Sequence, residues 1–462
     1  MEQRHAHIII ITYPAQGHIN PSLHLAERLV DMGMDVTFTT SLSGRRCMPL
    51  KYRDVNPSST SDKIRKGLHV KLFSDGYDEG IKNPADSADF YAKLKHNGAK
   101  CLEETIASGA QGNPVSCVVY TIFYPWVAEV ARGFHLPSML YWIQPAAVLD
   151  IYYYYFNGYE RSFQNMDEPS WSIKLPGLPL LKKRDLPSFI LPSTEDVYTK
   201  ALAAVKQHFD EFNSDPGARV LVNTCEDLEH SALKSIEKLN LVAVGPVIQS
   251  GNFSDGRNDS VENSRNYIEW LNSKAESSVI YISFGTMLKL PKAEMEEIAK
   301  GLLKSGRPFL WVVKRNEDDK EEDNLSCMEE LEKQGLIVPW CSQIEVLCHK
   351  ALGCFVTHCG WNSTLESLAS GVPVVAYPKW TDQGTIAKMI EDVWKTGVRV
   401  SGSEVGNVDG DEIYGCLETV MGGGDRAEEL RRNAKKWKDL AREAVKEGGS
   451  SYNNLKALVQ DI

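Results

Sequence analysis

Polar side chains that could bind an anion follow one short predicted strand, Cys354 to Thr357 in CFVTH. His358 ends this segment, a Cys-Gly break follows, and a helical run opens with two good N-cap residues, Asn362 and Ser363. A helix that starts where a strand ends presents free backbone N–H groups and the positive end of its dipole. With His358, Asn362 and Ser363 as further donors, the junction is predicted to hold a diphosphate.

The junction lies inside a longer segment, Trp340 to Gln383, whose residue types and spacing match a known pattern. Strand, break and helix alone would fit an ordinary parallel α/β unit. The full segment resembles, at matching spacing, the 44-residue donor signature of plant UDP-dependent glycosyltransferases of family 1. The matching residues are Trp340, Gln343, His358, Trp361, Asn362, Ser363, Glu366, Asp382 and Gln383.

This resemblance implies roles in binding the nucleotide. Trp340 would stack on uracil with Gln343 near its edge, and Glu366 would hold the ribose hydroxyls. Thr286, in the loop after the strand of YISFGT, would add a phosphate contact. Trp361 counts as a donor-binding residue, and the diphosphate would be held by His358, Asn362 and Ser363.

Asp382 and Gln383 would hold the sugar. A carboxylate accepts hydrogen bonds from two neighbouring hydroxyls, and an amide both donates and accepts. A terminal Gln in this family usually accompanies glucose, so UDP-glucose is the expected co-substrate. No metal and no other cofactor are expected.

His18 follows the first predicted strand, Ala6 to Tyr13, in the segment PAQGHINP. A lone histidine there could simply cap or pack. Attack of an acceptor oxygen on the anomeric carbon needs a base, and histidine can serve near neutral pH. His18 matches the family's catalytic histidine, which implies inverting transfer to a β-glucoside, with charge on the departing UDP held by His358 and the helix N-terminus.

Thr121 stands where many family members pair that histidine with an aspartate. It can hold the imidazole tautomer but supplies no carboxylate, and Glu129, the acid that follows, is expected on the solvent face. A carboxylic acid with a pKa of about 4 is already ionised at neutral pH, so the favoured product is a glucose ester. The alternatives are phenolic O-glucosylation of a flavonoid or anthocyanin, and a catalytically silent small-molecule binder, against which the retained His18 argues.

The acceptor wall is expected in the N-terminal half of the chain. Its candidates are Phe123, Trp126, Trp142 and Gln144, with one or two residues of the run Tyr152 to Phe156. Aromatic stripes more often form core, and successive helical residues turn through about 100°, so this run cannot all face one way. Such a wall would suit a flat aromatic or polyene acceptor.

Two further segments place the chain within the family. DGYDEG at Asp75 to Gly80 and FNGYE at Phe156 to Glu160 resemble the subgroup that contains crocetin and auxin glucose-ester formers and anthocyanin 5-O-glucosyltransferases. Two residues depart from the family pattern: Ile386 replaces a common Asn after Gln383, and Lys350 replaces a usual Pro. Ile386 would most simply be an apolar packing residue.

These residues must be positioned by an α/β fold, because short β-rich segments alternate with amphipathic helical ones. The resemblance implies the GT-B architecture, two facing Rossmann-like domains with the site in the cleft. We expect an acceptor-binding domain over 1–248, a linker over 249–265 rich in Ser, Asn, Asp and Gly, and a UDP-sugar-binding domain over 266–445. A break at Gly448-Gly449 would let the last helix, about 446–462, return to the first domain. Strands are expected at 6–13, 35–40, 69–73, 115–120, 138–142, 220–223, 279–283, 309–313, 336–338, 354–357 and 372–376.

Composition limits the partners. The 462 residues include 51 Lys and Arg against 62 Asp and Glu, a net charge of −11, which disfavours nucleic acid as a partner. The best apolar stretch, Ser138 to Phe156, is interrupted by Gln144, Pro145 and Asp150, so no membrane span is expected. Ten cysteines without a CxxC pair and no signal-peptide core predict a cytoplasmic protein, expected to be a monomer.

Other chemistries fit less well. No GxGxxG follows a predicted strand, which disfavours a dinucleotide oxidoreductase, and a UDP-sugar epimerase would not explain the plant-type donor signature. Crowded Cys341, Cys348, His349, Cys354, His358 and Cys359 lack the paired spacing of a zinc site. The DxD at Asp409 to Asp411 is better explained as a helix N-cap.

Overall fold

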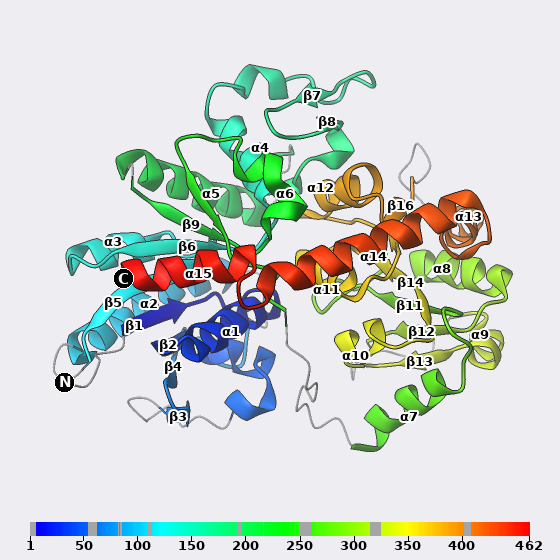
Figure 1. Ribbon diagram of the computed structural model, residues 1–462, viewed down its shortest axis with the longest axis horizontal. Helices are drawn as coiled ribbons and strands as arrows, with labels where there is room; N and C mark the ends of the chain where they lie inside the picture. Colours follow the sequence, from blue (N-terminus) through cyan, green and yellow to red (C-terminus); the bar gives the residue numbers. More distant parts are fainter. Residues whose placement is uncertain are drawn as a thin grey trace.

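The computed structural model describes residues 6–53, 62–81, 83, 86–109, 113–191, 196–215, 217–248, 261–314, 325–401 and 408–462. Two α/β lobes lie side by side, and one long helix, α14 (Asp425–Val445), runs from the second lobe toward the first (Figure 1). In the figure the N-terminal lobe runs from blue to green, and the C-terminal lobe from green through yellow to orange.

The N-terminal lobe is built on an eight-stranded sheet in the order β10-β9-β6-β5-β1-β2-β4-β3. Its strands pair in parallel except for the antiparallel edge pair β3 and β4. The central strand β1 is buried along its whole length, as expected for a parallel strand covered on both faces. The strands are β1 His7–Ile11, β2 Asp35–Ser41, β3 Asp62–Arg65, β4 Leu68–Phe73, β5 Val115–Thr121, β6 Ser138–Trp142, β9 Arg219–Val222 and β10 Asn240–Ala243.

Helices and short turns connect these strands. A two-stranded ribbon of β7 (Ile173–Lys174) and β8 (Leu180–Leu181) lies outside the main sheet, followed by the single turns η5 (Lys183–Asp185) and η6 (Ser188–Ile190). The helices are α1 Gln16–Asp31, α2 Ser87–Gly109, α3 Trp126–Gly133, α4 Ala146–Phe156, α5 Asp196–Ser214 and α6 Glu226–Leu233, and the other turns are η1 Leu42–Cys47, η2 Leu50–Tyr52 and η4 Glu160–Phe163.

The C-terminal lobe holds a six-stranded parallel sheet in the order β13-β12-β11-β14-β15-β16. Its strands are β11 Val279–Ser283, β12 Phe309–Val312, β13 Leu336–Val338, β14 Leu352–Thr357, β15 Val374–Ala376 and β16 Gly397–Arg399. Its helical elements are α7 Val261–Asn272, α8 Lys292–Ser305, α9 Met328–Gln334, α10 Gln343–Leu347, α11 Trp361–Ser370, α12 Gln383–Lys388, η8 Met389–Val393 and α13 Gly410–Met421.

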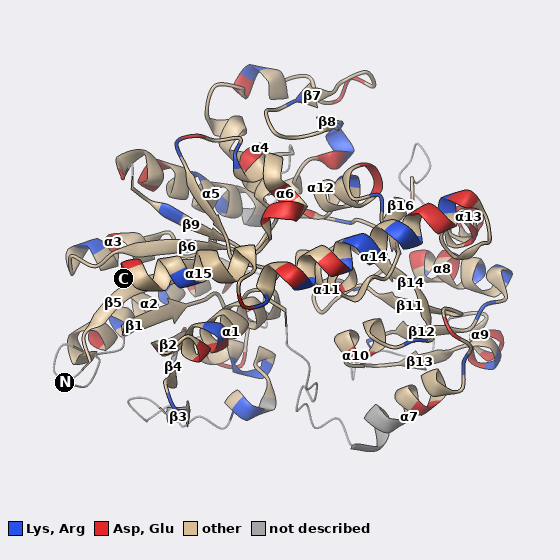
Figure 2. Ribbon diagram, in the orientation of Figure 1, with Lys and Arg blue, Asp and Glu red and all other residues tan. Residues whose placement is uncertain are grey.

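The last two helices link the lobes. α14 packs on α11 and α13 of the C-terminal lobe and on α6 of the N-terminal lobe, and both charge signs follow its length (Figure 2). After a break at Gly448-Gly449, α15 (Ser450–Asp461) lies against β10, where Asn454 donates to the Ala243 carbonyl at 2.9 Å. Leu455 joins a core cluster of the N-terminal lobe.

The predicted strands agree with the observed ones to within two residues at each end, while β3, β7, β8, β10 and β16 were not predicted. Of the linker expected over 249–265, residues 249–260 lie outside the described residues, whereas 261–265 form the start of α7. The expected domain limits stay a prediction. The N-cap prediction for Asn362 and Ser363 was wrong, because α11 begins at Trp361 with Gly360 as its N-cap.

Candidate active site

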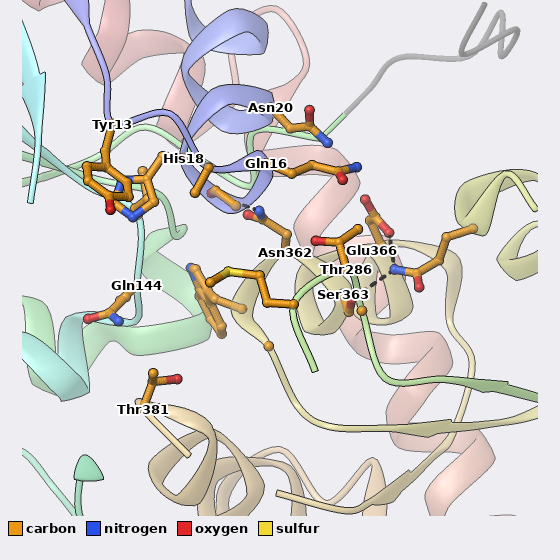
Figure 3. A pocket seen from close by; sticks show the side chains of 18 of the residues that line it. Tyr13, Gln16, His18, Asn20, Gln144, Thr286, Asn362, Ser363, Glu366 and Thr381 are labelled. Carbon is orange, nitrogen blue, oxygen red and sulfur yellow. Dashed lines mark hydrogen bonds between the residues drawn. The ribbon is translucent and has the colours of Figure 1, made fainter. Parts of the chain in front are cut away.

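A cavity of about 1060 Å³ lies between the two lobes, where the carboxyl ends of both sheets face each other. Side chains from α1 and from the strand ends of β5 and β6 line one side, and residues after β11, β14 and β15 line the other (Figure 3). Ligands of parallel α/β folds bind at such carboxyl ends. Most of the predicted site residues line this cavity: His18, Phe123, Gln144, Thr286, Trp340, Gln343, His358, Trp361, Asn362, Ser363, Glu366, Asp382 and Gln383.

Thr121 lies beside the cavity and contacts His18. β1 and β5 are neighbours in the sheet, so the loop after β1 and the end of β5 meet. The Thr121 hydroxyl is 3.2 Å from His18 Nδ1, and Thr121 is fully buried. The predicted hydrogen bond between these two side chains is therefore present.

Aromatic side chains pack against His18, which is half-buried in the wall of the cavity. Its ring stacks on Phe123 at a centroid distance of 5.2 Å and lies 5.4 Å from the ring of Tyr13. Burial lowers the pKa of the imidazole to about 3. His18 is therefore neutral at physiological pH.

The acceptor prediction was wrong for two tryptophans. Trp126 packs into the core, so closely on α2 that a Cβ at Gly98 would lie 3.0 Å from its ring. Trp142 donates its indole N–H to the Pro145 carbonyl at 2.9 Å and meets Tyr152 edge to face. Neither lines the cavity, and no residue of the run Tyr152 to Phe156 does so. These aromatic side chains fill the space between sheet and helices.

The acceptor end of the cavity is lined instead by residues from several elements. We define it by Tyr13, Tyr91, Ala92, Ile122, Phe123, Ile143, Gln144, Phe189, Lys200, Ala201 and Ala204. Tyr13 could have been predicted, since it ends the first predicted strand beside His18. Tyr91, Phe189 and Lys200 carry no comparable signal in the sequence.

On the opposite side, the N-terminus of α11 faces α1. Asn362 reaches across the cleft and donates to the Gly17 carbonyl at 3.0 Å (Figure 3). Gln343 donates to Ser363 Oγ at 2.9 Å and to Glu366 Oε2 at 2.6 Å. Gln343, predicted at the edge of uracil, is thus bonded to the residue predicted to hold the ribose and to one of those predicted to hold the diphosphate.

His358 directly follows β14 and packs on the loop after β11. Gly285 in that loop has a φ of 75°, and a Cβ there would lie 2.8 Å from His358 Cε1. Only glycine avoids both the strained backbone and this contact. Burial lowers the pKa of His358 to about 4, so it offers a neutral imidazole.

Trp361 has a structural role besides lining the cavity. Its indole N–H donates to the Asn223 carbonyl of the N-terminal lobe at 2.8 Å, and its ring lies 6.0 Å from that of Trp394. Trp361 therefore ties α11 to the other lobe.

Asp382 and Gln383 stand at the start of α12. Burial raises the pKa of the Asp382 carboxyl to about 6. The Gln383 carbonyl oxygen accepts the N–H groups of Lys379 and Trp380 at 2.9 and 3.0 Å, so its amide nitrogen is the end that can donate to a ligand. Ile386 is fully buried in the core, consistent with the packing role expected for it.

The remaining predictions concern metals and membranes. Among the described residues, no three His, Cys, Asp or Glu side chains come together as a metal ion would require. Asp409 accepts the N–H of Glu412 at 2.8 Å, which confirms its role as the N-cap of α13. Within the described part of the chain, no helix is both long and apolar enough to span a bilayer. Glu129 is exposed, as predicted.

Comparison with known proteins identifies the family of this chain. Residues 246–435 match the family described as UDP-glucoronosyl and UDP-glucosyl transferase. The crocetin glucosyltransferase, chloroplastic, of Gardenia jasminoides is 54% identical, with 100% of this chain and 98% of that protein covered. The chain belongs to this family.

A second relative and a solved structure confirm the predicted subgroup and fold. The anthocyanidin 3-O-glucoside 5-O-glucosyltransferase of Verbena hybrida is 48% identical over 99% of each chain. Os79 from O. sativa in complex with UDP is 32% identical with a TM-score of 0.78, covering 98% of this chain and 99% of that one. This UDP-glycosyltransferase is thus a plant-type enzyme of the α/β GT-B fold that transfers a glucosyl group from a UDP-sugar.

Proposed function

We propose that this UDP-glycosyltransferase moves glucose from UDP-glucose to the carboxylate of a small plant metabolite and yields a β-glucose ester. The observation that carries the proposal is the contact of His18 with a threonine, Thr121, at 3.2 Å in place of a carboxylate. A buried imidazole with a pKa of about 3 is a weak base, poorly matched to a phenol with a pKa of about 10. An ionised carboxylate needs no base.

The hydroxyl groups beneath His18 support the same conclusion. Ser22 donates to Thr12 Oγ1 at 3.3 Å, and the Tyr13 N–H donates to Thr121 Oγ1 at 3.2 Å. The Thr12 hydroxyl lies 3.2 Å from that of Thr121, and in the arrangement we propose it donates to Thr121. With both acceptor positions of its oxygen filled in this arrangement, Thr121 would donate to His18 Nδ1. This leaves the imidazole proton on Nε2, which can orient an acceptor carboxylate but cannot take a proton.

In the reaction we propose, a carboxylate oxygen of the acceptor attacks the anomeric carbon. The bond from that carbon to the β-phosphate oxygen breaks, and UDP leaves with the electron pair. His358, Ser363, Thr286 and the α11 N-terminus would stabilise the charge that grows on the diphosphate. No proton is transferred in this step.

Charge at the acceptor end also favours an anion. Among the described residues defined above as the acceptor end, Lys200 is the one that carries a charge. Its ammonium lies 5.8 Å from the ring centroid of Tyr91, whose hydroxyl accepts from Tyr13 at 3.3 Å. Tyr13 in turn borders His18, so an elongated acid could contact the lysine with one end and the histidine with the other.

Phenolic O-glucosylation is the second candidate. The name of the Verbena hybrida relative states 5-O-glucosylation of an anthocyanidin glucoside, which requires a hydroxyl acceptor. In that case His18 would need the opposite tautomer, with Nε2 free to take the proton. Sequence identity to the relatives does not distinguish the two acceptor classes, because the relatives include enzymes named for both.

The test is UDP release from UDP-glucose with aromatic and polyene acids compared with flavonoids and anthocyanidins. Wild type should glucosylate the acids and give alkali-labile products. Thr121→Asp would accept from Nδ1–H and free Nε2, so it should raise phenol turnover at least tenfold without improving acids. Thr121→Asn, which has the same shape without the charge, should not raise it.

Turnover of phenols alone, improved by Thr121→Asp, would refute the ester proposal. His18→Ala distinguishes a general base from a group that only orients the acceptor. It should abolish glucosylation of phenols, which needs the base, and only reduce glucosylation of carboxylic acids, where the histidine orients the carboxylate. Lys200→Met should raise KM for acids several-fold and leave KM for neutral phenols unchanged.

We further propose that the enzyme needs no metal and acts as a monomer in the cytoplasm. The neutral and dipolar groups around the diphosphate supply the charge stabilisation that a metal provides elsewhere. The Gardenia jasminoides relative is named chloroplastic, so fractionation of plant cells with a tagged chain is the measurement that decides the compartment.

A further inference from the structure

The turn that carries Asp382 and Gln383 is held by a residue of the other lobe. Ser188, the first residue of η6, donates its N–H to the Thr381 carbonyl at 2.8 Å, and its hydroxyl accepts the Thr381 N–H at 2.8 Å. Thr381 has a φ of 56°, in the left-handed region that β-branched residues rarely occupy. Two hydrogen bonds to one side of a strained residue fix its backbone in place.

A second group of contacts joins η5 to the same turn. Asp185, almost fully buried, pairs with Arg399 at 2.7 Å, and Arg399 also donates to the Arg184 carbonyl at 2.8 Å. The Thr385 hydroxyl donates to the Asp185 carbonyl at 2.7 Å. A Cβ on Gly384 would lie 2.5 Å from the Arg184 carbonyl oxygen, so the two backbones touch.

This contact determines where the side chains of the turn point. Thr381 precedes Asp382 directly, and its hydroxyl donates to Asp382 Oδ1 at 2.8 Å. Gln383 is anchored within the turn through its bonds to Lys379 and Trp380. A rotation of the Thr381 peptide groups would therefore carry both side chains away from their present positions in the cavity.

We propose that Ser188 and Asp185 are positioning residues for the donor sugar: the N-terminal lobe, through residues 182–188, sets where Asp382 and Gln383 meet the hexose. Neither Ser188 nor Asp185 lines the cavity, so both act through the turn. The inference rests on the proposed function, because the assignment of the turn to glucose is part of it. Recognition of the sugar would then depend on the contact between the lobes. Binding of uridine by Trp340, Gln343 and Glu366 would not depend on it.

The experiment compares Ser188→Ala with Ser188→Thr, which keeps the hydroxyl, and with Lys183→Ala, an exposed change on the same segment. For each variant we would measure KM for UDP-glucose, Kd for UDP, the rate ratio of UDP-glucose to UDP-galactose, and the melting temperature. Ser188→Ala should raise KM for UDP-glucose about tenfold and lower the rate ratio of UDP-glucose to UDP-galactose, because the Thr381 N–H loses its hydrogen-bond acceptor. Kd for UDP should stay within about twofold, and both other variants should resemble wild type.

A lower melting temperature with unchanged KM and sugar preference would overturn the proposal and leave Ser188 a purely structural role. Equal losses in Kd for UDP and KM for UDP-glucose would also overturn it. If Ser188→Ala does not fold, Thr385→Val, which removes one bond to the same segment, should show the same selective rise in KM.

Gln383→Ala separates this proposal from the one on which it rests. If Gln383→Ala raises KM for UDP-glucose and Ser188→Ala does not, the positioning role alone fails. If neither variant changes KM or sugar preference, the assignment of the turn to the sugar is wrong.

Discussion

Replacing Asp382 by Asn should stabilise the unliganded enzyme at neutral pH while it weakens the use of UDP-glucose. Burial raises the pKa of the Asp382 carboxyl to about 6, against an ordinary value of about 3.9. Between these pH values the folded protein keeps a proton that the unfolded chain has released. The stability that this group contributes therefore falls as pH rises from about 4 to about 6.

Above about pH 6 the buried charge costs on the order of 3 kcal/mol of folding free energy, which the Asn variant avoids. The variant loses little else, because Asn can still accept from Thr381, and Asp382 caps no N–H of α12 with its side chain. Melting temperatures of both proteins without ligand, measured from about pH 4 to about pH 8, provide the assay. The variant should match wild type at the acidic end and exceed it increasingly up to about pH 7.

A constant difference between the two proteins over this range would refute the reasoning, since it would mean that Asp382 does not titrate differently in the folded state. The same pair of proteins should differ in KM for UDP-glucose and agree in Kd for UDP. Other buried groups titrate in this range as well, but they are common to both proteins and cancel in the comparison.

Two further predictions concern the donor side and the lobe contact. Gly285→Ala should weaken UDP binding at least tenfold in calorimetry, because the new Cβ would collide with His358. Gly133→Ala is the control: this glycine has open space around it, so the affinity for UDP should not change. Equal affinities for UDP in the two variants would contradict this account. Trp361→Phe should lower the free energy of unfolding by about 1–3 kcal/mol in denaturant titrations, because the buried Asn223 carbonyl loses its hydrogen-bond donor. An unchanged unfolding midpoint would show that this bond is dispensable.

Much of this structure could be predicted from the sequence because its main signals are local. Parallel strands buried on both faces, such as β1, appear as short apolar runs. The donor side is encoded in one contiguous segment, so the resemblance of that segment to a known donor signature was enough to place His358, Glu366 and Gln383 at one cavity. The short strands β10 and β16 were not predicted, since four and three residues with mixed burial carry too little pattern.

The acceptor side could not be predicted in the same way. Trp142 and Gln144 lie two residues apart, yet one is buried core and the other lines the cavity, since the chain turns after β6. Lys200 and Ser188 reach the cavity or its supporting turn from segments far along the chain, and the bond from Thr381 to Ser188 spans 193 positions. Contacts between residues this far apart leave no local pattern in a single sequence.

The apolar core that surrounds Trp361, Ile386 and Trp394 of the C-terminal lobe is continuous with that around Tyr152 and Leu228 of the N-terminal lobe. The two lobes are therefore not interchangeable modules. A chimaera that joins the acceptor half of one family member to the donor half of another at the linker would bring together core surfaces that did not evolve as partners. Recombination for new acceptors should succeed more often when α12 and η8 are exchanged together with the N-terminal residues that they contact.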